Sequence, residues 1–230
     1  MKTKKLLFVS VLAVFLSVIA TAQDCGLYSM SKGMVLGYQS LDGKGKINGS
    51  SRITCLDVSK AGSAYVYKVK SEYFDAKDKS QPSREYEMRC EDGKFYMNMQ
   101  GLLDPKSMES FKDMEITVKS TDMMYPSKLS PGETLPDANI TVGAATGGIS
   151  LMNMVINIKN RKVVGTESVT VPAGTFDCYK ITYDMETKMI FTTNMAMVEY
   201  VNMGVGSIKS ETYDKKGKLS ASNVLTEVKK

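Results

Sequence analysis

Three pairs of methionines give this sequence its most distinctive chemical potential. Methionine occurs 17 times in 230 residues. Six of these residues form Met-x-Met pairs: Met97/Met99, Met152/Met154 and Met195/Met197. Residues two apart in a β-strand project from one face, so each pair would place two thioethers side by side. Such pairs can fill an irregular core, line a cavity for apolar ligands, or offer soft sulfur donors to Cu(I).

Core filling is the simplest interpretation, because methionine adapts to irregular gaps. Copper binding is the weakest, because no histidine accompanies the pairs. We therefore treat the six methionines as candidate ligand-binding residues for an apolar or lipidic ligand, and we predict no metal site.

The absence of histidine excludes much catalytic chemistry. Ser-His-Asp and Cys-His hydrolases, histidine-ligated zinc and imidazole proton shuttles all need this side chain. An enzyme would have to rely on carboxylates, lysine, tyrosine, serine or cysteine. We predict that the protein is not an enzyme and carries no cofactor.

Paired carboxylates are the remaining catalytic alternative. A glycan hydrolase needs two acids facing each other at a defined separation. The candidate acids are Glu72, Glu85, Glu87, Asp184, Glu186 and Glu199. Their alternation with apolar neighbours is typical of the solvated face of a strand, so hydrolysis is kept only as an alternative function.

The four cysteines are Cys25, Cys55, Cys90 and Cys178. In an oxidising compartment an even number suggests disulfides, and four cysteines allow three pairings. One bridge with two buried thiols is equally consistent with a domain of this size. No C-x-x-C pair is present, so we expect a structural use.

Residues 1–22 have the features of a secretory signal peptide. A lysine-containing start precedes an apolar run from Leu6 to Ile19, and Ala20-Thr21-Ala22 forms a small-x-small cleavage motif. The apolar run is too short for a membrane span, so we expect cleavage after Ala22 and no transmembrane segment in the mature protein. Export would place it in the periplasm or on the surface of a Gram-negative bacterium.

Residues 23–230 are predicted to form a single β-rich domain. Three lysines and no acids lie in the first 22 positions, so the remaining chain has a formal charge of only +2. No basic stripe with interleaved aromatic residues is present, which argues against a nucleic-acid partner. An apolar ligand or a cell-envelope protein is the expected kind of partner.

Alternation of apolar and polar residues with a period of two predicts most of the strands that must position the candidate methionines and acids. The predicted strands include two near 65–70 and 85–90, and later ones near 114–119, 151–158, 162–171, 178–185, 188–200, 205–213 and 218–228. One short helix is predicted from Asp104, as its N-cap, to about Asp113. An irregular link near 125–139 separates two strand-rich halves, and a glycine-containing loop should feed a strand within 142–156.

Three similar segments predict hairpin turns. The segments 42–46, 75–79 and 214–218 each begin with Asp, have Gly or Asp three residues later, and end with Lys. The first Asp can accept hydrogen bonds from the following amides, while the later residue adopts the left-handed conformation that closes a type I turn with a bulge.

Several segments together resemble the TapB-like family of exported bacterial proteins, domain of unknown function 3108. The most specific is 169–181, VTVPAGTFDCYKI, supported by 129–137, LSPGETLPD, and by 204–214, GVGSIKSETYD. The segments 23–25 and 90–96 are also similar. The sequence departs from the family pattern at 199–203, where members often carry a Trp-Tyr pair, and at Cys55, which leaves the disulfide pairing open.

The resemblance implies an antiparallel, barrel-like β-domain, export, and no established activity. The predicted fold is therefore a mainly β protein: a curved antiparallel sheet, or open barrel, with one short helix packed on it. Within the family signature, Pro172-Ala173-Gly174 should form a tight turn between two strands, with Phe176, Tyr179 and Ile181 returning to the core. We expect a binding module with a Met-lined core or cavity; a protein-interaction module of the cell envelope is the alternative.

Overall fold

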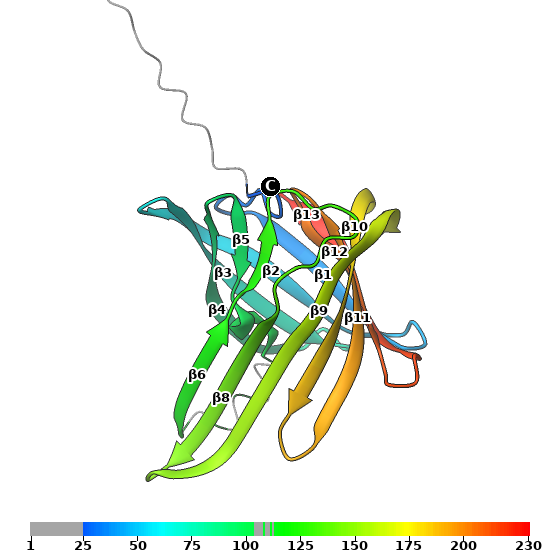
Figure 1. Cartoon of the computed structure of the whole chain (residues 1–230). Coiled ribbons are helices and arrows are strands. Elements are labelled where there is room, and N and C mark those ends of the chain that lie inside the picture. The colour runs from blue at the N-terminus through cyan, green and yellow to red at the C-terminus, as the bar shows by residue number, and fades with distance from the viewer. Residues whose placement is uncertain (1–24, 104–107, 109–110, 112) are drawn as a thin grey trace, which may run out of the picture.

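The computed structural model describes residues 25–103, 108, 111 and 113–230. Within them, thirteen strands form one antiparallel sheet that curls into a nearly closed barrel (Figure 1). The strands follow the order β6-β8-β9-β10-β11-β12-β13-β1-β2-β3-β4-β5-β7. This arrangement confirms the prediction of a mainly β, antiparallel, barrel-like domain.

The first part of the chain contains five strands and a short 3-10 helix: β1 Val35–Asp42, β2 Ile47–Ala61, β3 Ala64–Asp75, β4 Ser80–Glu91, β5 Lys94–Met97 and η1 Met99–Leu102. The second part contains eight strands: β6 Glu115–Thr121, β7 Met123–Pro126, β8 Ala138–Thr146, β9 Ile149–Val171, β10 Gly174–Lys188, β11 Thr192–Asn202, β12 Gly206–Tyr213 and β13 Leu219–Lys229.

The barrel closes through a single stretch of chain. β6 pairs with β8 and β7 pairs with β5, so these two strands are the two edges of the sheet. Only Asp122 separates them in sequence. The single stretch 115–126 therefore forms both edges of the sheet, and β6 and β7 each pair with a strand on one side only.

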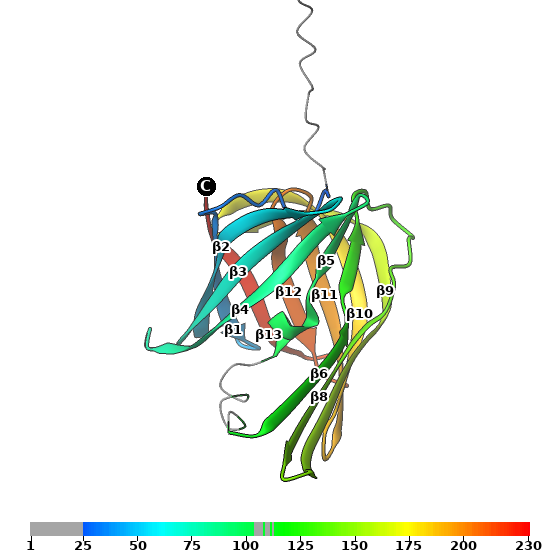
Figure 2. The same cartoon turned by 90° about the vertical axis from the view of Figure 1, so that its left-hand side faces the viewer.

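The two ends of the barrel differ. At the upper end of Figure 1 lie the turns 61–63, 92–93, 172–173 and 203–205, and both ends of the described chain. At the lower end lie the turns near 42–46, 75–79, 147–148, 189–191 and 214–218. The upper half is filled by a core that includes the buried Leu27, Leu36, Phe95, Tyr125, Val163 and Leu225. Figure 2 shows the barrel from the side, with the β8–β9 and β10–β11 hairpins extending lowest.

The three predicted Asp turns are present. The Oδ1 atom of Asp42 accepts hydrogen bonds from the backbone N–H groups of Lys44 and Lys46, both at 2.9 Å. Asp75 and Asp214 make the equivalent pairs of contacts. These N–H donors stabilise the ionised carboxylates and lower the pKa of all three aspartates.

The turn of the family signature also forms as predicted. β9 ends at Val171 and β10 begins at Gly174, whose φ of 134° explains why glycine occupies this position. Ile181 is fully buried in the core, and Phe176 and Tyr179 are half-buried against it.

Strand boundaries differ from the predictions in the second half of the chain. The segments 151–158 and 162–171 are parts of one 23-residue strand, β9. Residues 138–146, assigned by sequence to the irregular link and a glycine loop, form strand β8. Gly143 fits there because a Cβ atom would lie 2.7 Å from the Thr117 Oγ1 atom on β6. The apolar run 189–191, predicted as the start of a strand, is the turn between β10 and β11.

The predicted helix from Asp104 to Asp113 falls mostly outside the described residues. In the part of the chain that the structure does describe, η1 is the only helical element for which both ends are defined. Met108, from the predicted helix, packs against the core.

One disulfide joins Cys25 to Cys90, at the upper end of β4, with 5.7 Å between the Cα atoms. Cys55 and Cys178 are buried free thiols. Burial raises the pKa of both, that of Cys178 to about 11, so they stay protonated near neutral pH. The bridge with two buried thiols is one of the arrangements that the sequence left open.

Candidate functional site

A cavity of about 630 Å³ occupies the lower half of the barrel. Its lining reaches Ser40, Asn48, Phe74 and Asn223, which lie close to the lower turns, so the cavity opens toward the lower end. Aromatic and sulfur-containing side chains dominate the wall: Tyr28, Tyr38, Tyr73, Phe74, Tyr86 and Tyr183, with Met30, Met88, Met97, Met185 and Met197. A volume of this size is typical of small-molecule sites.

The two facing walls differ in character. On β9–β11 the inner residues are mainly apolar, including Ile156, Ile158 and Met185. On β1–β3 the wall has more small polar side chains, including Ser40, Ser51 and Ser71. The cavity is therefore amphipathic across its width.

Two of the six candidate methionines, Met97 and Met197, line this cavity from opposite sides of the barrel. Met99 in η1 is fully buried in the core. Met152 and Met154 are half-buried on the inner face of β9, and Met195 lies opposite Met185 in the β10–β11 pair. Spacing missed Met30, Met88 and Met185, because each lines the cavity without a Met-x-Met partner.

Glu199 is the buried acid of the cavity. Its side chain reaches the lining from β11, and its Oε2 atom accepts a hydrogen bond of 2.9 Å from the Tyr125 hydroxyl. Burial raises the pKa of Glu199 above its ordinary value, although the Tyr125 hydrogen bond and the positive charge of Arg161 oppose this effect. Burial also raises the pKa of Tyr183, and the charge of Glu199 adds to this shift.

Arg161 is the cation near Glu199, and its side chain is completely buried. Its Nη1 atom donates hydrogen bonds to the carbonyl oxygens of Met124 at 3.0 Å and Pro136 at 2.9 Å. Its guanidinium carbon lies 4.6 Å from the centre of the Tyr125 ring. Among the described residues, its Nε and Nη2 atoms have no hydrogen-bond partner.

A change of phase within β9 turns Arg161 inward. Before the change Ile156 and Ile158 are buried; after it Arg161 and Val163 are buried. Asn160, with a φ of 57°, supplies the extra residue between the two phases. Sequence reasoning missed Arg161, although the break between the predicted strands 151–158 and 162–171 marks this position.

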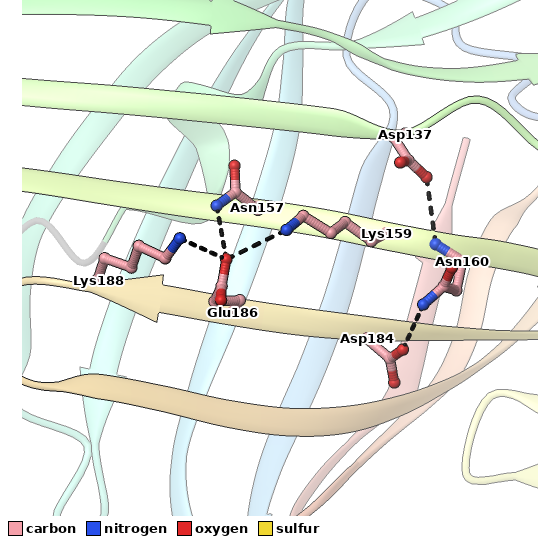
Figure 3. Close-up of polar contacts among 7 residues, drawn as sticks. All are labelled: Asp137, Asn157, Lys159, Asn160, Asp184, Glu186 and Lys188. Atoms are coloured by element: carbon pink, nitrogen blue, oxygen red, sulfur yellow. Dashed lines mark hydrogen bonds and ion pairs between the residues drawn. The ribbon is translucent and has the colours of Figure 1, made fainter.

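Polar contacts on the outside of the barrel hold the Asn160 bulge in place (Figure 3). The Asn160 backbone N–H donates to the Asp137 carboxylate at 3.1 Å, and its side-chain amide donates to the Asp184 Oδ2 atom at 2.8 Å. Two residues further along β10, the Glu186 Oε1 atom accepts a hydrogen bond from the Asn157 side chain. The same atom forms ion pairs with Lys159 and Lys188. These three donors lower the pKa of Glu186.

The six candidate acids do not converge on one site. Glu186 and Asp184 belong to the outer network, and Glu72 and Glu85 pair with Lys70 and Lys68. Glu87 alternates with cavity-lining Tyr86 and Met88, so it points outward. Of these six acids, only Glu199 lines the cavity, so no second carboxylate among them lies opposite it in the cavity wall.

Tyrosine hydroxyls supply further polar groups. The Tyr38 hydroxyl donates to the Ser207 carbonyl at 3.0 Å, and the Ser207 N–H lies 3.4 Å from the Tyr28 hydroxyl. The Tyr86 hydroxyl and Ser71 Oγ are 3.2 Å apart. Burial raises the pKa of all three tyrosines, so their hydroxyls remain protonated hydrogen-bonding groups.

The buried carboxyl predicts a pH dependence of stability. Because the pKa of Glu199 is raised in the folded state, folded protein binds this proton more tightly than the unfolded chain does. The contribution of Glu199 is complete below its unfolded pKa, near 4.5, and is lost as the pH rises through the folded value. We expect the unfolding temperature of the wild type, relative to that of Glu199→Gln, to fall over this interval. Differential scanning calorimetry at a series of pH values measures this difference in unfolding temperature. The control is Glu87→Gln, at an exposed position: the difference between the wild type and this variant should not change over the same pH interval.

The fold and cavity together define a class of barrel-shaped, all-antiparallel proteins with one filled and one open end. A model of the DUF3108-like family matches residues 31–225. The chain therefore belongs to the DUF3108-like family, as its sequence segments indicated.

Two solved structures with the same fold come from Bacteroidetes. A protein from Bacteroides fragilis, classed as exported and with a YmcC-like fold, has a TM-score of 0.74 and 23% identity, covering 89% of this chain and 99% of that one. A protein from Parabacteroides distasonis, classed as a lipoprotein, has a TM-score of 0.74 and 22% identity, covering 90% and 100%. No curated protein matches the sequence. None of the helices among the described residues has the length and apolar character needed to cross a bilayer.

Proposed function

We propose that this protein is an exported, non-enzymatic binding protein of the cell envelope that holds an apolar, lipid-like ligand in its cavity. The observation that carries the proposal is the cavity of about 630 Å³ with a wall rich in methionine and tyrosine. Methionine side chains adapt to ligands of different shape, and tyrosines present apolar rings with a polar tip.

The amphipathic character of the cavity indicates an amphipathic ligand. Its apolar part would contact Ile156, Ile158 and Met185, and its polar group would reach the tyrosine hydroxyls or Glu199. Because an ionised Glu199 would repel a carboxylate, a neutral or cationic head group is favoured over an anionic one.

Export is supported by the leader-like residues 1–22 and by the description of the two structural neighbours as exported and as a lipoprotein. The Cys25–Cys90 bridge suits an oxidising compartment. Mass spectrometry of the protein recovered from the periplasm should give a chain that begins at Gln23, and an intact leader would contradict cleavage after Ala22.

The binding proposal is tested by titrating the purified protein with an uncharged naphthylamine probe and displacing it with long-chain alcohols, amines and fatty acids. The double variant Met185→Gln/Met197→Gln keeps the side-chain volume but makes the apolar wall polar. We expect its dissociation constant to rise by about tenfold or more, from the loss of apolar contact.

Met189→Gln is the matched control, because Met189 is exposed in the β10–β11 turn and does not line the cavity. Its affinity should equal that of the wild type. Absence of displaceable binding by the wild type, or equal affinity in all three proteins, would overturn the proposal.

A further inference from the structure

Two neighbouring hairpins at the lower end expose large apolar side chains. In the β10–β11 turn, Ile190 is 90% exposed and Phe191 is 82% exposed. At the start of β9, Ile149 is 67% exposed and Leu151 is 57% exposed. With Met189, these account for five of the eight large apolar residues exposed in the described part of the chain. Single exposed apolar residues are ordinary, but such a group at one end needs an explanation.

The shape of this region favours insertion into a soft phase. β9 pairs with β10, with Val155 opposite Lys188, so the two hairpins are neighbours in the sheet. Both extend below the other strands as separate tips (Figure 1, Figure 2). A bilayer interface can surround such projecting side chains on all sides, whereas a protein partner would need matching pockets.

The charge of the lower end gives the chemistry of the partner. The segments 42–46, 75–79, 186–191 and 214–218 contain eight lysines, four aspartates and one glutamate, a surplus of three positive charges. The lysines, all exposed, are Lys44, Lys46, Lys77, Lys79, Lys188, Lys215, Lys216 and Lys218. At the upper end, the turns 61–63, 92–93, 172–173 and 203–205 contain one charged residue, Asp92, and the segment 229–230 adds two lysines. Most of the lysine-rich turns therefore lie at the lower end, the end that also carries the apolar tips (Figure 1, Figure 2).

We propose that the lower end docks on an anionic bilayer surface. Ile190 and Phe191, with Ile149 and Leu151, enter the boundary between head groups and acyl chains, and the surrounding lysines contact lipid phosphates. Docking in this orientation places the mouth of the cavity against the lipid. The docking surface is formed by the tips and turns alone, so it does not depend on a ligand occupying the cavity.

Co-sedimentation with vesicles tests this surface. The purified protein, with its N-terminus checked by mass spectrometry, is mixed with vesicles of phosphatidylcholine alone or with 30% phosphatidylglycerol. We expect stronger binding to the anionic vesicles, weakened by salt. Ile190→Ser/Phe191→Ser should reduce the partition coefficient by at least about tenfold, since two large apolar side chains are lost from the interface.

Matched variants separate the two contributions. Val164→Ser removes an apolar side chain that is 47% exposed but lies outside the tips, and it should bind as the wild type does. Lys215→Gln/Lys216→Gln/Lys218→Gln should weaken binding to anionic vesicles and leave binding to neutral vesicles unchanged.

A fluorescent reporter locates the contact, because the chain contains no tryptophan. Phe191→Trp places the only indole at the tip, and Ala61→Trp places it on the exposed upper end. Anionic vesicles should shift the emission of the first variant to shorter wavelength and allow brominated lipids to quench it, with neither effect for the second.

The proposal is overturned if the wild type binds neither vesicle, if Ile190→Ser/Phe191→Ser binds undiminished, or if the indole at position 61 responds instead of that at 191. Binding of an envelope protein by the tips, without binding to either vesicle, would also overturn the proposal. The cavity variant Met185→Gln/Met197→Gln should still bind vesicles, so failure of docking and failure of ligand binding are distinguishable.

Discussion

Replacing Arg161 with methionine is expected to lower the free energy of unfolding by about 3–5 kcal/mol, the cost typical of leaving a buried charge without compensation. The substitution leaves Glu199 buried without its nearby cation and removes two hydrogen bonds, to the carbonyls of Met124 and Pro136. Urea denaturation followed by circular dichroism measures the change. Lys162→Met, at the exposed neighbouring position, should change stability by no more than about 0.5 kcal/mol.

The double variant Arg161→Met/Glu199→Gln identifies the cause. If the buried charge of Glu199 accounts for much of the loss, the double variant should be more stable than Arg161→Met by about 1 kcal/mol or more. A loss below about 1 kcal/mol in the single variant, or strict additivity of the two changes, would contradict electrostatic coupling between Arg161 and Glu199.

Removal of the Cys25–Cys90 bridge is the second substitution with a large expected effect. The two cysteines are 65 residues apart, and closing a loop of this length restricts the unfolded chain by about 4 kcal/mol in the chain-entropy model. We expect Cys25→Ala/Cys90→Ala to lose about that much stability, again measured by urea denaturation.

Reducing agent provides the control for this prediction. Dithiothreitol should destabilise both the wild type and Cys55→Ala/Cys178→Ala, which keeps the bridge. It should have no effect on Cys25→Ala/Cys90→Ala. Loss of this sensitivity in Cys55→Ala/Cys178→Ala, or sensitivity of Cys25→Ala/Cys90→Ala to reductant, would contradict the Cys25–Cys90 pairing.

Local signals explain which parts of the fold could be predicted. An Asp followed three residues later by a left-handed residue defines a turn within five positions, so the turns at Asp42, Asp75 and Asp214 followed directly from the sequence. The strands on either side alternate cleanly because one face meets the interior and the other meets water. Strand β8 was not predicted because its Gly143 is typical of a loop. The close approach of Thr117 from the paired strand β6 explains why glycine occurs there, and this contact is not visible in the local sequence.

The site depends on information that is not local. Met-x-Met spacing places two side chains on one face only where both lie in one strand, as in β9 and β11; Met99 instead follows β5 in η1. Ring closure then decides whether that face borders the cavity, as for Met197, or packs against the core, as for Met152. Arg161 is inward only because Asn160 shifts the phase of β9, and an isolated Asn gives no sequence signal for a bulge. Glu199 was a candidate acid, yet its burial follows from the neighbours that β7 and β9 bring to it.

The pairing of β1 with β13 sets a condition on biosynthesis. Val35 lies opposite Lys229, so the first and the last strands complete the sheet together. A chain emerging from its N-terminus can form its successive hairpins early, but β1 lacks this neighbour until residues 219–229 have been made. A product cut short before Leu219 would leave β1 and β12 with open backbone groups and invite aggregation.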